Sequence, residues 1–166
     1  FLSYGLARFG LNASHAGLDG VIVPDLPPDE AVPMLQECRP NGIDVIHLLA
    51  PTSTDTRIEK ACQAASGFIY CVSLTGVTGV RDQLPQGVFG LLDRVGRYTD
   101  LPLAVGFGIS RRDHVESLRG HAHAAMVGSA LMSVIMESPR EEVVERAGAY
   151  VMELSGAIPP IKEAIS

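Results

Sequence analysis

The sequence predicts an α/β protein built on a parallel sheet, and three observations support this. Short apolar segments rich in β-branched residues recur along the 166 residues, with helix-like segments between them. These segments are continuous rather than alternating, as in strands that are buried on both faces of a parallel sheet. The connections between them are short, which is typical of consecutive βα units. The length suits a single domain with its own core.

Five apolar segments are predicted to be strands: 20–26, 45–51, 67–74, 101–108 and 124–131. Helices are expected at 1–16, 29–39, 54–65, 87–98, 110–119 and 139–155, with a short extra helix at 129–137. Ser110 is suited to the N-cap of its helix, Pro139 to a first turn, and Gly156 to a helix end. We therefore expect one domain over residues 1–155 and a loose tail over 156–166.

Small and polar residues gather where the predicted strands end, and this favours a barrel over an open doubly wound sheet. They lie at Asp25 and in segments 51–53, 73–79, 106–110 and 128–129. No GxGxxG or GxxxxGK[ST] loop follows a strand, which weakens the nucleotide-binding alternatives. A complete (β/α)₈ TIM barrel needs about 250 residues. We therefore expect a partial barrel of about five βα units, with a natural start and about three further units upstream of Phe1.

Composition excludes several classes of function. The net charge of −6 argues against non-specific nucleic-acid binding, which needs a basic face. No apolar run approaches the roughly 18 residues of a membrane span, and no signal peptide is recognisable. Cys38, Cys62 and Cys71 are odd in number and lack metal-ligand spacing. We expect reduced thiols in a cytoplasmic protein.

Glycine and serine at the strand ends suggest a phosphate site. A phosphate needs backbone N–H groups, close approach without side chains, and the positive end of a helix dipole. Gly108 and Gly128-Ser129 follow the last two predicted strands, where barrels commonly bind phosphate beside a short extra helix. The alternative is that these glycines only permit tight turns. The pattern indicates a ligand class and leaves the reaction open.

Four stretches together, AGLDGVIVPDLPPDE, SLTGVTG, LPLAVGFGIS and MVGSALMSVI, resemble the α chain of tryptophan synthase in wording, order and spacing. The resemblance implies a (β/α)₈ barrel that cleaves indole-3-glycerol phosphate to indole and glyceraldehyde 3-phosphate by a retro-aldol reaction. It also implies an α2β2 complex with a β chain. That partner would carry the pyridoxal phosphate, and this chain would need no cofactor.

The resemblance also implies roles for individual residues. The catalytic Glu and Asp would lie upstream of Phe1, so no catalytic carboxylate is expected in this segment. Supporting roles fall to Tyr70 and to Thr78, the latter on a lid that begins at 74–79. The residues that match the phosphate site are Gly79, Gly108, Gly128 and Ser129. Those that match the walls of the indole pocket are Phe107 and Met126.

Several alternatives stay open. Asp25 could face the lid as a site residue or anchor the following prolines. The protein could be another phosphate-binding barrel, such as a phosphosugar isomerase or epimerase, or a non-catalytic phospho-ligand-binding remnant. No Lys lies in the predicted strands, which disfavours Schiff-base chemistry. His121 and His123 lack a further ligand nearby, so we expect no metal and a loop or strand-start role. His47 is predicted to be structural.

Overall fold

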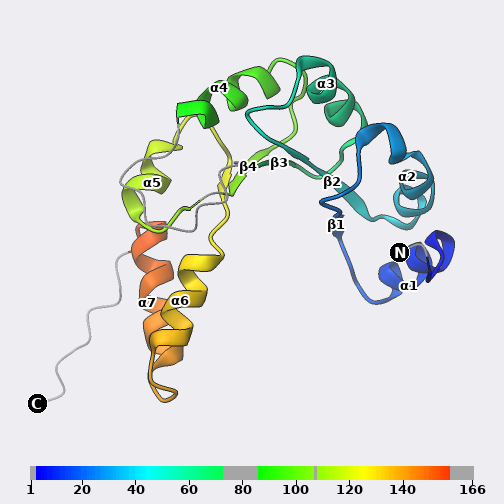
Figure 1. Cartoon of the computed structure of the whole chain (residues 1–166). Coiled ribbons are helices and arrows are strands. Elements are labelled where there is room, and N and C mark those ends of the chain that lie inside the picture. The colour runs from blue at the N-terminus through cyan, green and yellow to red at the C-terminus, as the bar shows by residue number, and fades with distance from the viewer. Residues whose placement is uncertain (1–2, 73–85, 107, 158–166) are drawn as a thin grey trace, which may run out of the picture.

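The computed structural model describes residues 3–72, 86–106 and 108–157. Five strands form one parallel sheet in the order β1-β2-β3-β4-β5. Their bounds are β1 Gly20–Ile22, β2 Asp44–Leu49, β3 Ile69–Val72, β4 Leu103–Gly106 and β5 Ala124–Ala125. The sheet curves, and Figure 1 shows the helices that connect the strands along its outer side. Each strand pairs with the next one in sequence, whereas a doubly wound sheet would show a reversal of strand order. This confirms the predicted partial barrel.

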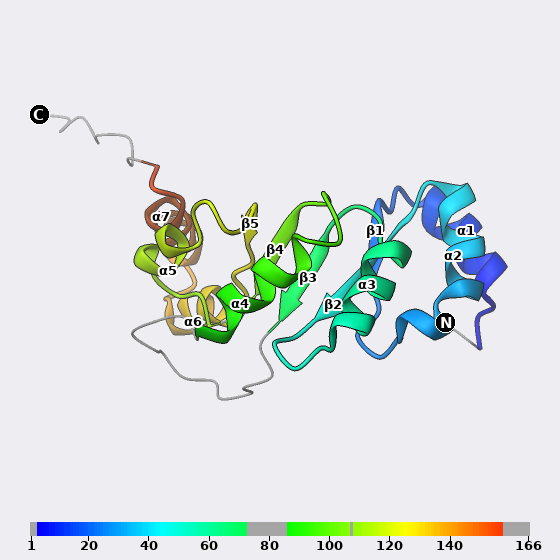
Figure 2. The ribbon, with the colours of Figure 1, turned by 90° about the horizontal axis from the view of Figure 1, so that it is seen from above.

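The helices follow the predicted rhythm. They are α1 Leu6–His15, α2 Val32–Cys38, α3 Asp55–Ala64, α4 Gln86–Val95, α5 Arg112–Ser117, α6 Ser129–Glu137 and α7 Val143–Ser155. Two short 3₁₀ helices, η1 Pro28–Glu30 and η2 Arg39–Asn41, flank α2. In Figure 2, α1 and α2 lie at one end of the molecule and α5, α6 and α7 at the other.

Several predicted boundaries were wrong for physical reasons. The helix expected at 29–39 is divided because Pro33, which has no N–H, is placed in the first turn of α2. The strand expected at 124–131 stops at Ala125, since the chain enters α6 at Ser129. The final helix begins at Val143 rather than near Pro139, and its end at Gly156, in the left-handed region with φ 76, is confirmed.

Side chains pointing outward from the sheet form the core beneath the helices. The larger cluster joins β2, β3 and β4 to α3, α4 and α5, and includes Leu49, Ile69, Cys71 and Val105. A second cluster packs α1 and α2 on β1 and β2 around Val45 and Cys38. Cys38, Cys62 and Cys71 are free and buried, which confirms unpaired thiols. No helix in the described ranges combines the length and apolar character of a membrane span.

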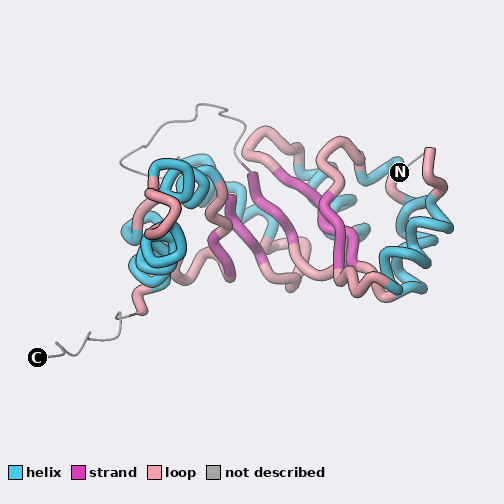
Figure 3. The backbone as a smooth tube through the Cα atoms, turned by 90° about the horizontal axis from the view of Figure 1, so that it is seen from below, coloured by secondary structure: helices cyan, strands magenta, loops and turns pink. Residues whose placement is uncertain are grey.

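Within the described part of the chain, the sheet has no further strand beyond β1 or β5. Among the described residues, β1 pairs only with β2, and β5 only with β4. Figure 3 shows the strands side by side across the middle of the molecule, with helices at both ends. The described strands therefore form an open, partial barrel.

Candidate active site

All carboxyl ends of the strands lie at one edge of the sheet because the strands are parallel. The segments that follow β1, β2, β4 and β5 therefore leave the sheet on the same side. In barrels this is the side that carries the functional loops. Most of the residues that the sequence analysis singled out lie here, and they come from separate strands.

Gly108 and Gly128 follow neighbouring strands at the same sequence distance from a registered pair of residues. Val105 of β4 is in register with Ala125 of β5, and each glycine lies three residues beyond its member of this pair. Gly108 has φ +39, and a Cβ built on either glycine would meet nothing within 4 Å. Both positions therefore present open backbone on the side of the strand ends.

The two turns also offer unused hydrogen-bond donors. Ser129 begins α6, so the first amides of this helix have no partner within the helix. The amides of Gly108 and Ile109 make no hydrogen bond to any residue in the described ranges. Together with the positive end of the helix dipole, these N–H groups suit an anion.

Tyr70 lies on the inner face of β3 and leans toward the carboxyl edge. Its backbone is in register with Ala104, but its ring and hydroxyl occupy the space where a Cβ of Gly106 would lie. Gly106 is two residues closer to the strand end than Ala104. The hydroxyl of Tyr70 is therefore directed toward the edge that carries the two glycine turns, and the absent side chain at Gly106 makes room for it.

Met126 follows β5 and its amide donates to the carbonyl of Val105 at 2.8 Å. Its neighbours Ala125 and Val127 pack against the outer core, so alternation places the half-buried Met126 on the inner face. Thr78, Gly79 and Phe107 lie outside the described residues.

Asp25 does not end a strand, which corrects the prediction. β1 stops at Ile22, and Asp25 is exposed in a turn in which the amide of Leu26 donates to the carbonyl of Val23 at 3.2 Å. Within the described ranges its carboxylate makes no ion pair. It lies on the carboxyl side of the sheet, as both of its predicted roles require.

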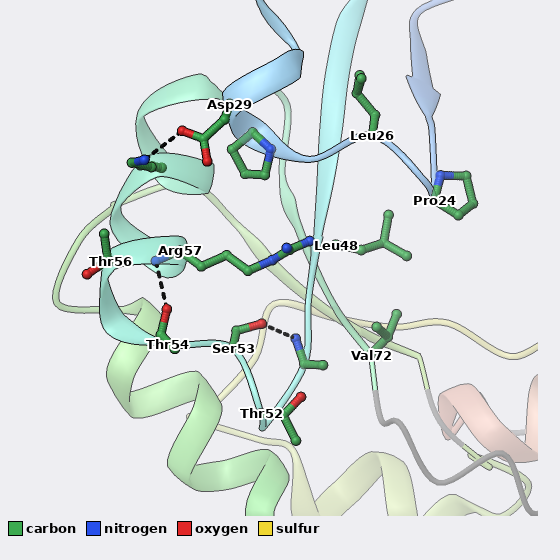
Figure 4. Close-up of a pocket in the computed structure, with 13 residues that line it drawn as sticks. Pro24, Leu26, Asp29, Leu48, Thr52, Ser53, Thr54, Thr56, Arg57 and Val72 are labelled. Atoms are coloured by element: carbon green, nitrogen blue, oxygen red, sulfur yellow. Dashed lines mark hydrogen bonds and ion pairs between the residues drawn. The ribbon is translucent and has the colours of Figure 1, made fainter.

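A pocket of about 690 Å³ opens at the carboxyl ends of β1 and β2. Figure 4 shows apolar Leu48 and Val72 from the sheet on one side and the side chain of Arg57 from α3 on the other. The sequence analysis missed Leu48 and Val72. Alternation within their strands could have revealed them, since the next residue of β2 and the preceding residue of β3, Leu49 and Cys71, pack into the outer core.

The rim of this pocket is held by local hydrogen bonds. Thr54 caps α3 by accepting from the amide of Arg57 at 3.3 Å. The hydroxyl of Ser53 accepts from the amide of Ala50 at 3.0 Å. Lys60 and Asp29 form an exposed ion pair at 2.6 Å (Figure 4). Hydrogen bonds of its own polar side chains therefore contribute to the shape of the loop after β2.

The histidines have structural positions. His47 is 3% exposed on the outer side of β2, and burial, with Arg39 and Arg57 nearby, lowers its pKa. Nδ1 of His123 accepts from the amide of Leu103 at 3.0 Å, and His121 packs edge-on against Phe89. The described residues contain no group of three His, Cys, Asp or Glu side chains that could hold a metal ion.

A sequence model of the family described as tryptophan synthase alpha chain matches residues 1–158. The chain belongs to the tryptophan synthase alpha chain family. The tryptophan synthase alpha chain of Roseiflexus castenholzii is 53% identical over 156 residues, which cover 94% of this chain and 60% of that relative. The alpha chain of Methanocaldococcus jannaschii is 42% identical over 131 residues, or 79% of this chain and 47% of the relative.

Solved alpha subunits share the fold. A structure from a study of mutual activation in the tryptophan synthase a2b2 complex of Pyrococcus furiosus has a TM-score of 0.84 at 38% identity. The match covers 93% of this chain and 62% of that one. The matches thus span 60%, 47% and 62% of the lengths of these three relatives. Membership of this family decides against the phosphosugar isomerase or epimerase alternative.

Proposed function

We propose that this chain contributes the phosphate-binding part of a lyase that cleaves indole-3-glycerol phosphate to indole and glyceraldehyde 3-phosphate. The observation that carries the proposal is that Gly108 and Gly128-Ser129 lie just beyond two paired, adjacent strands, with amides at both turns that have no hydrogen-bond partner in the described ranges. A phosphate between them would receive N–H groups from two turns and the α6 dipole. Membership of the tryptophan synthase alpha chain family supports indole-3-glycerol phosphate as the substrate.

The cleavage breaks a carbon–carbon bond between the indole ring and the glycerol chain. A proton must reach the ring carbon, and a base must remove the proton of the neighbouring hydroxyl. We expect the Glu and Asp that do this in the part of the relatives that this chain does not match. Met126 and the apolar side chains of the pocket would then line the indole ring, and Tyr70 would support the catalytic groups. The resemblance assigns Phe107 to the same wall, Gly79 to the phosphate site and Thr78 to the lid. This chain alone would bind phosphate and would not cleave the substrate.

We also propose that the completed protein works with a β chain in the cytoplasm. The Pyrococcus furiosus relative has been described in an a2b2 complex. Pyridoxal phosphate would belong to the β chain, and no cofactor is assigned to this one.

Two proteins test the proposal: this chain alone, and a completed chain in which the segment of the Roseiflexus castenholzii relative outside the match is joined to it. Indole release is measured from indole-3-glycerol phosphate. The completed chain should release indole, and this chain alone should release none. Turnover by this chain alone would show that the acid and base lie within it.

The substitution Gly128→Asp, made in the completed chain, tests the phosphate site. A carboxylate there would repel the anion, and release should fall to background. Gly148→Asp, in the exposed middle of α7, is the matched control and should leave activity unchanged. Equal activity of Gly128→Asp and wild type would refute the phosphate site. Phosphate binding without turnover in the completed chain would favour a non-catalytic phospho-ligand protein.

A further inference from the structure

Side chains of two helices, α5 and α7, hydrogen-bond to the backbone of Ser110 in the turn that carries Gly108. The amide of Ser110 lies 3.4 Å from Nδ1 of His114 in α5 and donates to it when the ring proton is on Nε2, which itself lies 3.3 Å from the guanidinium of Arg111. The carbonyl of Ser110 accepts from the hydroxyl of Tyr150 in α7 at 2.9 Å. His114 is 2% exposed and Tyr150 is half-buried. Ser110 was predicted to cap α5, but that prediction is wrong, because Arg111 occupies the N-cap position.

Such support matters because the turn cannot fix its own direction. Gly108 has φ +39 and no side chain, so many backbone conformations are open to it. The first carbonyl used by α5 belongs to Arg111, which accepts from Val115, so the Ser110 carbonyl is not held by the helix. An anion site gains affinity when its donors are already aimed before the ligand arrives. The hydrogen bond from Tyr150 fixes the orientation of the backbone at the end of the turn.

Tyr150 is itself fixed by the packing of α7 on α5. Leu154, one helical turn further on, is 7% exposed. The guanidinium of Arg112 lies where a Cβ of Gly156 would be, at the end of α7. A tyrosine hydroxyl is protonated at neutral pH and can donate this bond, and burial, with Glu153 nearby, raises the pKa of Tyr150 further. A side chain of α7 thus hydrogen-bonds to a turn that lies 40 residues earlier in the sequence.

We propose that Tyr150 and His114 are positioning residues for the turn at Gly108–Ser110, and that they set the affinity for a phosphomonoester without acting in bond cleavage. The inference rests on the proposed phosphate site at Gly108 and Gly128-Ser129. Neither side chain contacts the ligand in this assignment. Each acts on one backbone group of Ser110 and thereby on the amides that precede it.

Tyr150→Phe is the first test because it removes only the hydroxyl. Binding of glycerol 3-phosphate is measured by calorimetry on this chain and on the completed chain, and steady-state kinetics are measured on the completed chain. A lost hydrogen bond of about 1 kcal/mol corresponds to about a fivefold change in affinity. We expect the Kd and the KM to rise about fivefold while kcat stays unchanged, the pattern of lost uniform binding. Tyr98→Phe, which removes an exposed hydroxyl elsewhere, is the matched control and should change neither.

His114 provides a rescue test. His114→Gln keeps an acceptor for the Ser110 amide and should bind glycerol 3-phosphate like wild type, whereas His114→Leu should raise the Kd as Tyr150→Phe does. An unchanged Kd in Tyr150→Phe, or equal losses in the Gln and Leu variants, would overturn the inference. If the completed chain without substitutions binds glycerol 3-phosphate but does not cleave indole-3-glycerol phosphate, the proposed function fails. The binding measurements on the variants still decide this inference. If neither wild-type protein binds the probe, both are overturned.

Discussion

The guanidinium of Arg94 in α4 donates a hydrogen bond to the backbone carbonyl of Ser53 at 2.5 Å. The same side chain donates to the carbonyl of Pro51 at 3.3 Å and pairs with Asp55 at 2.7 Å. One partly buried arginine therefore binds two carbonyls of the loop between β2 and α3 and the first side chain of α3. That loop forms the rim of the pocket, so its shape depends on a residue 41 positions away.

Arg94→Ala should lower the free energy of unfolding by about 1–3 kcal/mol, because two loop carbonyls lose a charged donor. Arg94→Lys should recover only part of the loss, since an ammonium cannot reproduce the planar geometry of the guanidinium. Urea unfolding of each variant measures the difference. Arg97→Ala, an exposed arginine just after the same helix, is the control. Equal stabilities of the Arg94 and Arg97 variants would contradict the assigned role.

Gly106→Ala should disturb Tyr70, whose ring and hydroxyl occupy the position of the new methyl group. Overpacking of this kind costs about 1–3 kcal/mol, and the ring can leave only by giving up its position beside the strand end. Adding Tyr70→Ala should remove most of this extra cost. A double-mutant cycle measured by urea unfolding tests it, and strict additivity of the two changes would show that the residues do not interact.

Two glycines of α7 should respond in opposite directions to alanine. Gly148 lies in the interior of the helix with open space around its Cβ position, so Gly148→Ala should stabilise by about 0.5–1 kcal/mol. Gly156 has φ 76, and a Cβ there would meet the guanidinium of Arg112, so Gly156→Ala should destabilise by about 1 kcal/mol or more. Thermal unfolding of the pair measures both. The same sign for both would be inconsistent with the C-cap geometry.

His47 should make stability depend on pH. Its pKa is lowered in the folded chain from 6.5, first by burial and then by Arg39 and Arg57. The unfolded state therefore binds more protons near and below pH 6.5, and the free energy of unfolding falls as the pH decreases through this range. His47→Leu should flatten this dependence between about pH 7 and 5. His15→Leu, at an exposed position, is the control; a profile unchanged by His47→Leu would exclude the histidine as the source.

The open sheet edges predict association of this chain. β1 and β5 each have one strand neighbour among the described residues, and Met136 and Val144 are 79% and 83% exposed. Unpaired strand edges and exposed apolar side chains favour contacts between chains. Sedimentation should show a mass that increases with protein concentration, and the completed chain should show a smaller increase. A single monomeric species of this chain at all concentrations would contradict the prediction.

Local chemistry was sufficient to predict much of the fold. The continuous apolar segments predicted a parallel sheet, and Gly128-Ser129 before an apolar stretch predicted α6 with its observed bounds. Thr54-Asp55 marked the start of α3 correctly, because a cap acts within three residues. These features depend on neighbours in sequence, so the sequence reveals them.

The sequence could not reveal contacts between distant segments. Ser110 has the chemistry of an N-cap, yet its carbonyl is bound by Tyr150 and the cap position shifts by one residue. Arg94 reads as an ordinary surface residue of α4 until the fold brings it to the loop after β2. Tyr70 and Gly106 likewise fit together only once β3 and β4 are in register. In each case tertiary packing decides between local options of similar energy.

The strand order also has a kinetic consequence. Among the described residues, each strand pairs only with strands adjacent to it in sequence, so no pairing in the sheet has to wait for a strand from the far end of the chain. Closing a longer loop costs more entropy, so pairing two adjacent strands costs less than pairing strands from the two ends of the chain. A ribosome releasing this chain would present β1, β2 and β3 in the order in which they pair. Assembly can therefore advance during synthesis, one strand and one helix at a time.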